Sequence, residues 1–218
     1  MNALNKKVSN NISINNGKVY LFIKRVIDIF GSLIGLIIFS PIFILISIAI
    51  KLEDPKGKIL FCQERVGINS NVFKMYKFRS MVSNAEELLE HVSKLNEMNG
   101  PVFKIKDDPR VTKVGRFIRK TSLDEIPQFI NILKGDMTFV GPRPPLASEV
   151  EQYSDYEMQR LMVKPGLTCY WQICGRNSID FDEWVELDLK YIEERNTFID
   201  IKIILKTFFV LFGDENAS

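Results

Sequence analysis

Residues 26–50 form the longest apolar stretch of the chain and contain one charged residue, Asp28. As a helix, this stretch is long enough to reach across the hydrocarbon core of a bilayer. Ser40 and Pro41 interrupt it, and because proline removes a backbone hydrogen bond we expect a bend there, with the serine hydroxyl satisfying a freed carbonyl. The pattern therefore predicts a membrane helix over residues 22–51 that is broken at Ser40-Pro41.

Basic residues lie on both sides of this apolar segment: Lys18, Lys24 and Arg25 before it, and Lys51, Lys56 and Lys58 after it. Basic flanks favour the cytoplasmic side of a membrane, so this chain satisfies the rule if both ends of the segment lie in the cytoplasm. We expect a re-entrant hairpin for this reason. An ordinary kinked transmembrane helix is the alternative, because many such helices contain proline.

The remaining chain predicts a mainly α-helical globular domain with a few short strands. Two extended segments are expected at 57–67 and 72–81, separated by the turn-like "INSN". Apolar residues at helical spacing, with caps and stops, predict helices within 83–98, 114–118, 122–135 and 181–195. By contrast, the prolines of "MTFVGPRPP" predict that residues 137–145 form no regular element but a rigid loop that presents Arg143.

The two ends of the chain carry weaker patterns. The first 17 residues are polar and rich in asparagine, which predicts a loose start. Residues 198–212 interrupt an apolar stretch with Asp200, Lys202 and Lys206, which predicts either an interfacial helix among lipid headgroups or a helix packed on the core. The expected division is a disordered N-terminus, a re-entrant helix, a catalytic domain and a C-terminal helix with its tail, at 1–21, 22–51, 52–196 and 197–218.

Composition narrows the chemistry that is open to the chain. The single histidine, His91, lies in the predicted surface helix 83–98, which argues against Ser-His, Cys-His and multi-histidine zinc sites. The three cysteines form no CxxC pair and favour a reducing compartment over a disulfide framework. The net charge is only +2, yet residues 104–120 contain seven basic and two acidic residues. An anionic partner is expected at that stretch.

Asp124 and Glu125 follow this basic stretch directly, and they have two interpretations. Ser122-x-x-Glu125 has the form of a capping box, in which acidic residues merely stabilise a helix start. Alternatively, two carboxylates at a helix start that is flanked by Arg119 and by the Arg143 loop suit a divalent metal and a polyphosphate. A carboxylate in such a place can also attack phosphorus as a nucleophile.

Six segments of the chain carry a resemblance to a known family: "KRVIDIFGSLIGLIIFSPIFIL", "QERVG", "YKFRSM", "DPRVTKVGRFIRKTSLDEIPQFINILKGDMTFVGPRPP", "KPGLTCYWQICGRN" and "DLKYIEERNTFIDIKIILKT". Together they resemble the bacterial sugar transferases, the monotopic polyprenyl-phosphate phosphoglycosyl transferases, over about residues 22–210. The resemblance implies transfer of a hexose-1-phosphate from a UDP-sugar to undecaprenyl phosphate with release of UMP, at the cytoplasmic face of the bacterial plasma membrane. It further implies the first membrane step of exopolysaccharide, capsule or O-antigen synthesis.

The resemblance also assigns roles to individual residues. It implies that Asp124 is the nucleophile that forms a covalent phosphosugar and that Glu125 is its partner toward Mg²⁺. The residues implied in binding phosphate or nucleotide are Arg119 and Arg143, more weakly Lys77 and Arg79, and with them Pro142 and Pro144 of the rigid loop. Ser40-Pro41 matches the family's helix break. The C-terminal region favours galactose or glucose as the sugar, and membrane lipids and a homo-oligomer are further expected partners.

The chain also departs from this family in places and leaves rival functions open. We expect a short form of the family, without the multi-span N-terminal region of the larger members, and Cys169 and Cys174 replace residues that are usual in their motif. One rival is a non-catalytic module whose basic stretch, residues 104–120, binds anionic lipid. A second is a lipid-phosphate hydrolase, in which water resolves the intermediate. Nucleic-acid binding is the weakest, because no reader motif accompanies the basic stretch.

Overall fold

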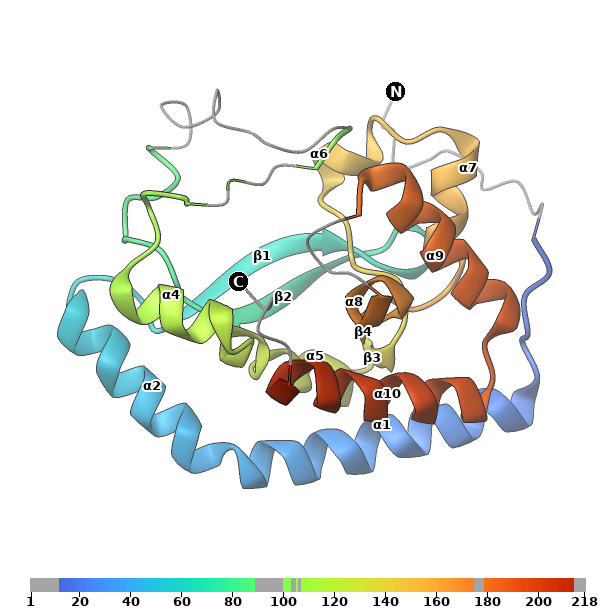
Figure 1. The fold of residues 1–218 in the computed structure, drawn as a ribbon, viewed down its shortest axis with the longest axis horizontal. Helices are drawn as coiled ribbons and strands as arrows, with labels where there is room; N and C mark the ends of the chain where they lie inside the picture. The colour runs from blue at the N-terminus through green and yellow to red at the C-terminus, as the bar shows by residue number, and fades with distance from the viewer. Residues whose placement is uncertain (1–11, 89–99, 103–104, 106, 175–178, 214–218) are drawn as a thin grey trace.

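The computed structural model describes residues 12–88, 100–102, 105, 107–174 and 179–213 (Figure 1). The described chain is mainly helical, with two small two-stranded sheets. This confirms the predicted fold class of a helical domain with short strands. In Figure 1 the long helices α1 (Lys18–Ile38) and α2 (Ser40–Glu53) run beneath the domain, and α10 (Thr197–Gly213) lies above α1.

The predicted break in the N-terminal apolar segment is confirmed. Helix α1 spans Lys18–Ile38, helix α2 spans Ser40–Glu53, and the two axes differ in direction by 59°. The Ser40 hydroxyl donates to the Ile37 carbonyl at 2.8 Å, as expected for a carbonyl freed near proline. Within the described ranges, only this bent pair taken together, and no individual helix, has the length and apolar content needed to cross a membrane.

Three charged residues of α1 fasten this helix to the domain. The Arg25 guanidinium donates to the last carbonyls of α5, at Ile132 and Leu133, at 2.8 Å each. The Lys24 ammonium group donates to the Val140 carbonyl and the Asp200 carboxylate, and the Asp28 carboxylate accepts from Thr138 and Phe139. Lys24 and Arg25 therefore serve as anchors to the protein as well as basic flanks of the apolar segment.

The start of the described chain is more ordered than the polar sequence predicts. Asn15 exchanges hydrogen bonds with Arg195: its side-chain amide donates to the Arg195 carbonyl at 3.0 Å, and its own carbonyl accepts from the Arg195 guanidinium at 2.9 Å. Ile12 and Ile14 pack against the main core. The expectation of a loose start is thus wrong for residues 12–17, because these long-range contacts replace the missing local pattern. The α1 helix also begins before the boundary expected at residue 22.

The first pair of predicted strands is confirmed. Strand β1 spans Leu60–Val66 and strand β2 spans Val72–Phe78, and they pair antiparallel with Phe61 opposite Lys77. A short turn of 3₁₀-helix, η2 at Ile68–Ser70, joins them where the sequence indicates a turn. Because Lys77 lies near the end of β2, the hairpin places its ammonium group beside the turn that follows α4.

The prediction that residues 137–145 form no regular element is wrong in its first half. Strand β3 spans Thr138–Val140 and pairs in parallel with β4, Gly166–Thr168. The prolines lie after this strand and leave its backbone free to pair. A Cβ atom on Gly166 would lie 2.1 Å from the Gly141 nitrogen, so only glycine permits this close approach of the two backbones.

The remaining helices surround these sheets. Their bounds are Lys113–Lys120 (α4), Leu123–Glu125 (η4), Gln128–Lys134 (α5), Ala147–Val150 (α6), Asp155–Met158 (α7), Gln159–Met162 (η5), Tyr170–Cys174 (α8), Phe181–Glu194 (α9) and Thr197–Gly213 (α10). The predicted helices at 114–118 and 181–195 are confirmed. The helix predicted from Ser83 is not formed at residues 83–88, which make turns instead, and His91 lies outside the described residues.

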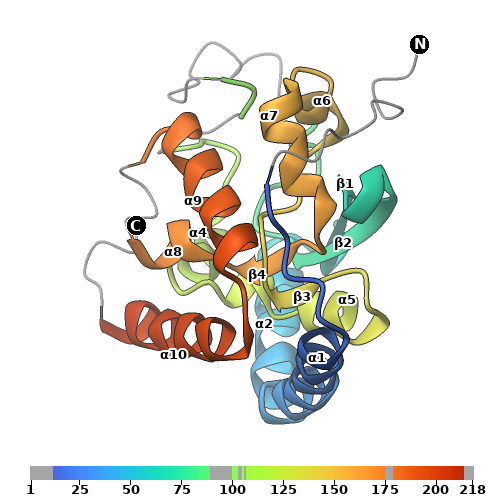
Figure 2. The ribbon, with the colours of Figure 1, turned by 90° about the vertical axis from the view of Figure 1, so that its right-hand side faces the viewer.

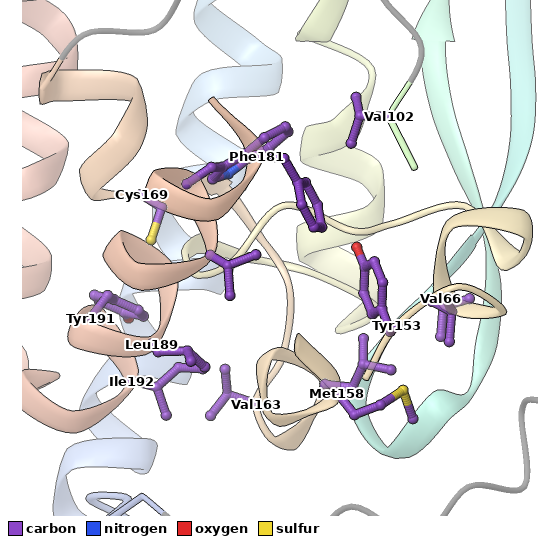
Figure 3. Packing of buried hydrophobic residues seen from close by; sticks show 14 of the residues in the cluster. Val66, Val102, Tyr153, Met158, Val163, Cys169, Phe181, Leu189, Tyr191 and Ile192 are labelled. Atoms are coloured by element: carbon purple, nitrogen blue, oxygen red, sulfur yellow. The ribbon is translucent and has the colours of Figure 1, made fainter. Parts of the chain in front are cut away.

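The main core brings side chains of α9 together with Val66 of β1 and with Tyr153 and Met158 (Figure 3). Tyr191 and Ile192 of α9 are almost fully buried there together with Val66 of β1. Helix α10 contributes Ile203, which is fully buried, while Phe198 and Phe209 on the same helix are each 76% exposed. One face of α10 therefore packs on the core, and its opposite face is an exposed apolar surface.

Candidate active site

The acidic pair occupies a short turn rather than the start of a capped helix. Ser122 has a left-handed backbone, with φ of 54°, and makes no side-chain capping bond, so the predicted capping box is wrong. The single helix expected over 122–135 is divided into η4 and α5. Pro127 explains the division, because it has no N–H with which to continue an α-helical bond pattern. The predicted stop is confirmed, since Gly135 adopts φ of 91°.

The structure places Asp124 and Glu125 against Lys77 of the hairpin. The Lys77 ammonium nitrogen lies 2.7 Å from a Glu125 carboxylate oxygen and 3.8 Å from Asp124 Oδ2. The β1–β2 pairing and the η4 turn are distant in sequence, so this cluster is a product of the tertiary fold. Lys77, predicted only as a phosphate-binding residue, is thus in direct contact with the predicted nucleophile and its partner.

Burial sets the protonation of Asp124. The residue is only 8% exposed, and this burial, with the neighbouring negative charge of Glu125, raises the pKa of its carboxyl to about 6. The positive charges of Lys77 and Arg119 act in the opposite direction and limit the rise. Asp124 is therefore mostly an ionised carboxylate at neutral pH, and it stands in a poorly solvated position that favours reaction with an electrophile.

Arg119 reaches the site from the last turn of α4. Its Nε donates to the Ser80 hydroxyl at 2.8 Å, which fixes the guanidinium beside the acidic pair. The helix itself lies directly on the chain at Ser80, because a Cβ atom at Gly115 would lie 1.9 Å from the Ser80 carbonyl oxygen. Glycine at position 115 thereby allows the approach that sets the place of Arg119.

Replacing Gly115 by alanine is expected to lower both stability and activity. The added methyl group would force α4 away from Ser80, at a cost of about 1–3 kcal/mol in the free energy of unfolding. The same shift would increase the distance between Arg119 and the acidic pair. The measurements are the unfolding temperature and the catalytic rate. Lys113→Ala, at an exposed position of the same helix, is the matched control. Equal behaviour of the two variants would contradict this account of the packing.

Arg79 is held by a contact that the sequence did not predict. Its guanidinium pairs with the Asp54 carboxylate just after α2 and donates to the Asp54 carbonyl at 2.9 Å. The residue lines the same cleft as Asp124, and its two bonds to Asp54 connect the end of α2 to the end of β2. The structure thus gives Arg79 a role in joining the apolar helix pair to the hairpin, while the predicted contact with phosphate stays a prediction.

The Arg143 loop is present as predicted, and it is held by residues that the sequence did not single out. Arg143 Nη1 lies 3.2 Å from the carboxylate of Glu149, which is only 2% exposed. Arg65 of β1 lies 4.0 Å from the same carboxylate and donates to the Pro144 carbonyl at 3.1 Å. Two guanidinium groups therefore share one buried carboxylate, which leaves an excess of positive charge at this wall.

The pKa of Arg65 reflects that arrangement. Burial, together with the nearby charge of Arg143, lowers the pKa of its guanidinium to about 9. Sequence reasoning missed both Arg65 and Glu149. The only available signal was the "QERVG" segment, which contains Arg65 but does not indicate a contact with the proline loop.

Pro142 and Pro144 are both buried and contribute through their backbones. The Pro142 carbonyl accepts from Gly166 N at 2.8 Å, and the Pro144 carbonyl accepts from Arg65. These bonds fix the loop that presents Arg143. Neither proline is among the residues that line the cleft, whereas Arg143 between them is. The two prolines therefore position Arg143.

The predicted residues border one large cleft with a volume of about 1860 Å³. Its lining includes Asp124, Glu125, Lys77, Arg79, Arg119 and Arg143. The cleft also reaches apolar side chains of α1 and α10. A single cavity thus joins a carboxylate, several cations and an apolar end, which suits a reaction between a phosphorylated polar molecule and a lipid.

The site also fits a hard divalent cation by its donor chemistry. Mg²⁺ binds oxygen ligands and in proteins often takes one or two carboxylates together with substrate phosphates. Asp124 and Glu125 supply the two adjacent carboxylates. In the part of the chain that the structure describes, no third acidic, cysteine or histidine side chain completes a metal cluster. Further ligands would have to come from substrate and water.

Comparison with known proteins decides the family. The model of a family described as bacterial sugar transferase matches residues 19–214. The chain belongs to this family. The chain is 50% identical over 200 residues to the galactosyl transferase CpsE of Streptococcus agalactiae, an alignment that covers 91% of this chain and 44% of the relative.

Two further relatives show how the chain compares in length with other sugar transferases. The undecaprenyl-phosphate galactose phosphotransferase of Salmonella typhimurium is 42% identical over 219 residues, covering 97% of this chain and 44% of the relative. The exopolysaccharide production protein ExoY of Rhizobium meliloti is 39% identical over 188 residues, covering 84% and 83%. The chain thus spans less than half of the first two relatives but most of the third.

Proposed function

We propose that the protein transfers a hexose-1-phosphate from a UDP-sugar to undecaprenyl phosphate, with release of UMP, and so begins the assembly of a surface polysaccharide. The observation that carries the proposal is the buried Asp124 carboxylate, 3.8 Å from Lys77, in a cleft that combines cations with an apolar end. Membership of the bacterial sugar transferases supports it. The names of two relatives favour galactose as the sugar, and the name of a third favours glucose.

In the proposed first step, an Asp124 carboxylate oxygen attacks the phosphorus atom that carries the sugar. The bond from this phosphorus to the bridging oxygen of the diphosphate breaks, and its electron pair leaves with UMP. The product on the enzyme is an aspartyl phosphosugar, a mixed anhydride. Lys77, Arg119 and Arg143 line the cleft in positions to balance the negative charge of the diphosphate as it approaches a carboxylate.

In the proposed second step, an oxygen of undecaprenyl phosphate attacks the same phosphorus. The bond between phosphorus and the Asp124 oxygen breaks, the carboxylate is regenerated, and the sugar leaves as a lipid-linked diphosphate. One carboxylate thus reacts with both substrates in turn. The transfer from a water-soluble UDP-sugar to a membrane lipid is thereby divided into two reactions at the same residue.

Mg²⁺ is part of the proposal. Asp124 and Glu125 would hold it, together with oxygens of the diphosphate, in keeping with its preferred ligands. When bound, the ion neutralises charge on the phosphoryl group and its leaving oxygen. The Lys77 ammonium nitrogen lies 2.7 Å from the Glu125 carboxylate and so holds this carboxylate beside Asp124.

The bent pair α1–α2 is proposed to enter the membrane from the cytoplasmic side and return to it. The support is the 59° bend, the exposed apolar side chains on both helices, and the attachment of both to the same domain. Lys24 and Arg25 hold α1 to that domain, and the Arg79–Asp54 pair holds the chain that follows α2. A hairpin with both ends tied to one domain has both ends on one side.

The test is an incubation of the protein in nanodiscs with radiolabelled UDP-galactose, UDP-glucose or a UDP-N-acetylhexosamine, with and without undecaprenyl phosphate. We expect one hexose to pass into the lipid phase in the presence of Mg²⁺, and UMP to form in an amount close to that of the enzyme when lipid is absent. Free sugar phosphate as the only product would instead indicate a hydrolase. No reaction under any condition, with membrane binding retained, would favour the lipid-binding module.

The activity is expected to fall as the pH is lowered through about 6, the pKa of Asp124. The attacking form is the carboxylate, so activity is present above this pKa and is lost below it as the carboxyl takes up a proton. The measurement is kcat/KM for the UDP-sugar against pH, which reports groups of the free enzyme. Lys77→Gln should move this acid limb to higher pH, because Lys77 lowers the pKa. A limb near pH 4, the usual range of aspartate, would contradict the burial argument.

A further inference from the structure

One part of the lining of the cleft that contains Asp124 is apolar, and we call it the apolar end. It is made by Ile27 and Gly31 of α1, Phe129 of α5, Phe139 of β3, and Ile204 and Phe208 of α10, and the side chains of Thr168 and Thr207 line the same cleft. Burial of hydrocarbon against such aliphatic and aromatic side chains is favourable. The apolar end therefore suits an apolar ligand or an apolar part of one.

Packing keeps this apolar end open and in a fixed shape. The Phe129 and Phe139 rings meet edge to face, with centroids 5.7 Å apart. Gly31 lets Phe139 approach α1, since a Cβ atom there would lie 2.7 Å from the ring. On the opposite side, the Thr207 hydroxyl lies 2.8 Å from that of Thr168 in β4, which fixes α10 at the position from which Phe208 borders the cleft.

The apolar end also continues onto the outer surface of the molecule. Figure 2 shows α1 and α10 next to each other at the base of the domain, and the two helices are in contact. Phe30 and Ile34 on α1 are 61% and 54% exposed, and Leu205 on α10 is 54% exposed. An apolar chain that leaves the cleft between these helices therefore remains against apolar surface.

We propose that the space between α1 and α10 binds the part of the isoprenoid chain nearest the phosphate of the lipid acceptor. This inference rests on the proposed function, which brings a lipid phosphate to Asp124. The phosphate would lie at the cationic end of the cleft, near Lys77, and the hydrocarbon would pass along Phe208 and Ile27 to the membrane. The charge at one end and the apolar lining at the other match the two parts of such a molecule.

Two neighbouring phenylalanines of α10 provide a matched test. Phe208 lines the cleft and is 50% exposed, whereas Phe209 is 76% exposed and does not line it. The Phe208→Ser and Phe209→Ser variants remove the same apolar area from the same exposed helix. We expect Phe208→Ser to raise KM for undecaprenyl phosphate about tenfold, by loss of ring contact with the hydrocarbon, and Phe209→Ser to leave it unchanged.

Separate assays distinguish this site from the donor reaction. Exchange of labelled UMP into the UDP-sugar needs no lipid and should proceed in both variants. With a water-soluble acceptor phosphate that carries no isoprene unit, the two variants should not differ. As a readout independent of turnover, an isoprenyl phosphate with a photoreactive group should label peptides that contain Ile27 or Phe208.

The possible outcomes separate the two claims. Equal increases of KM in both variants, or labelling confined to other helices, would overturn the proposed groove and indicate that α10 only docks on the membrane. Unchanged KM in Phe208→Ser would overturn it as well. Absence of UMP exchange in the wild-type protein would instead count against the proposed function itself.

Discussion

Asparagine in place of Asp124 is expected to lower UMP release from the UDP-sugar, and transfer of sugar to lipid, by on the order of 10³-fold or more. The side chain keeps its shape, but an amide does not form the mixed anhydride with the phosphosugar. Both half-reactions should fail together, because the same atom accepts the phosphoryl group and returns it. Loss of transfer with UMP exchange intact would contradict the role of Asp124.

The intermediate itself is measurable. A donor labelled in the phosphate that carries the sugar should leave label on the wild-type protein after acid quench, and hydroxylamine should release it. Asp124→Asn should carry none. Asp107→Asn is the matched control, since Asp107 is an exposed acid that lines the same cleft and its loss removes the same charge. Label on both aspartate variants would place the phosphosugar elsewhere.

The same substitution should make the protein more resistant to unfolding at pH 8. A carboxyl whose pKa is raised by burial favours the folded state when protonated, and this contribution is lost as the pH rises through about 6. Asparagine removes the buried charge, so its unfolding temperature should exceed that of the wild type at pH 8 and approach it at pH 5. The nucleophile thus lowers stability at neutral pH in exchange for reactivity.

Local chemistry explains which elements the sequence predicts well. The bend at Ser40-Pro41 follows from the missing N–H of proline, and the Ser40 hydroxyl donates to the Ile37 carbonyl as expected. Helix α9 begins where Asp180 accepts from the Glu183 backbone N–H, as its sequence indicates. In each case the determining contacts lie within a few residues along the chain.

The prediction fails where contacts from elsewhere in the chain, or a conflict between local rules, decide the structure. Ser122-x-x-Glu125 satisfies the letter pattern of a capping box, yet Ser122 adopts a left-handed backbone and Pro127 prevents one continuous helix. Residues 12–17 show no pattern, but Arg195 holds them from the other end of the chain. Neither outcome is contained in a window of neighbouring residues.

The candidate site shows the same division. Asp124, Glu125, Arg119 and Arg143 were predicted from motifs, and the structure brings all four to one cleft. The residue that holds Arg143, Glu149, was not predicted. Its carboxylate is nearly fully buried and lies 4.0 Å from Arg65 of β1, more than 80 positions away in the chain. Such a support is visible only after the chain has folded.

Methionine in place of Arg160 is expected to destabilise the domain by roughly 3–5 kcal/mol, because it leaves a buried carboxylate without its partner. Arg160 and Asp188 are 3% and 0% exposed, and the guanidinium reaches Asp188 Oδ2 at 2.7 Å and 2.9 Å through two nitrogens. It also donates to the Tyr153 hydroxyl at 2.8 Å. The pair joins η5 to α9, on which the main core is built.

The loss should depend on pH in a definite direction. Burial raises the pKa of Asp188, and the positive charge of Arg160 opposes this rise. Without the arginine the carboxyl takes up a proton more readily, so Arg160→Met should lose less stability at pH 5.5 than at pH 8. Thermal unfolding in detergent, followed by tryptophan fluorescence, measures the loss at each pH. At pH 8 the unfolding temperature of Arg160→Met is expected to lie about 10 °C below that of the wild type, for a protein of this size.

Two variants make this prediction sharp. Lys190→Met removes a positive charge from an exposed position of α9 and should change the free energy of unfolding by less than about 0.5 kcal/mol. Replacing both partners, Arg160→Met with Asp188→Leu, should recover much of the stability, since neither a charge nor an unpaired oxygen is then buried. A double variant less stable than Arg160→Met alone would contradict this account. Asp188 would then have to stabilise the core through another contact, such as its hydrogen bond with the Cys169 thiol.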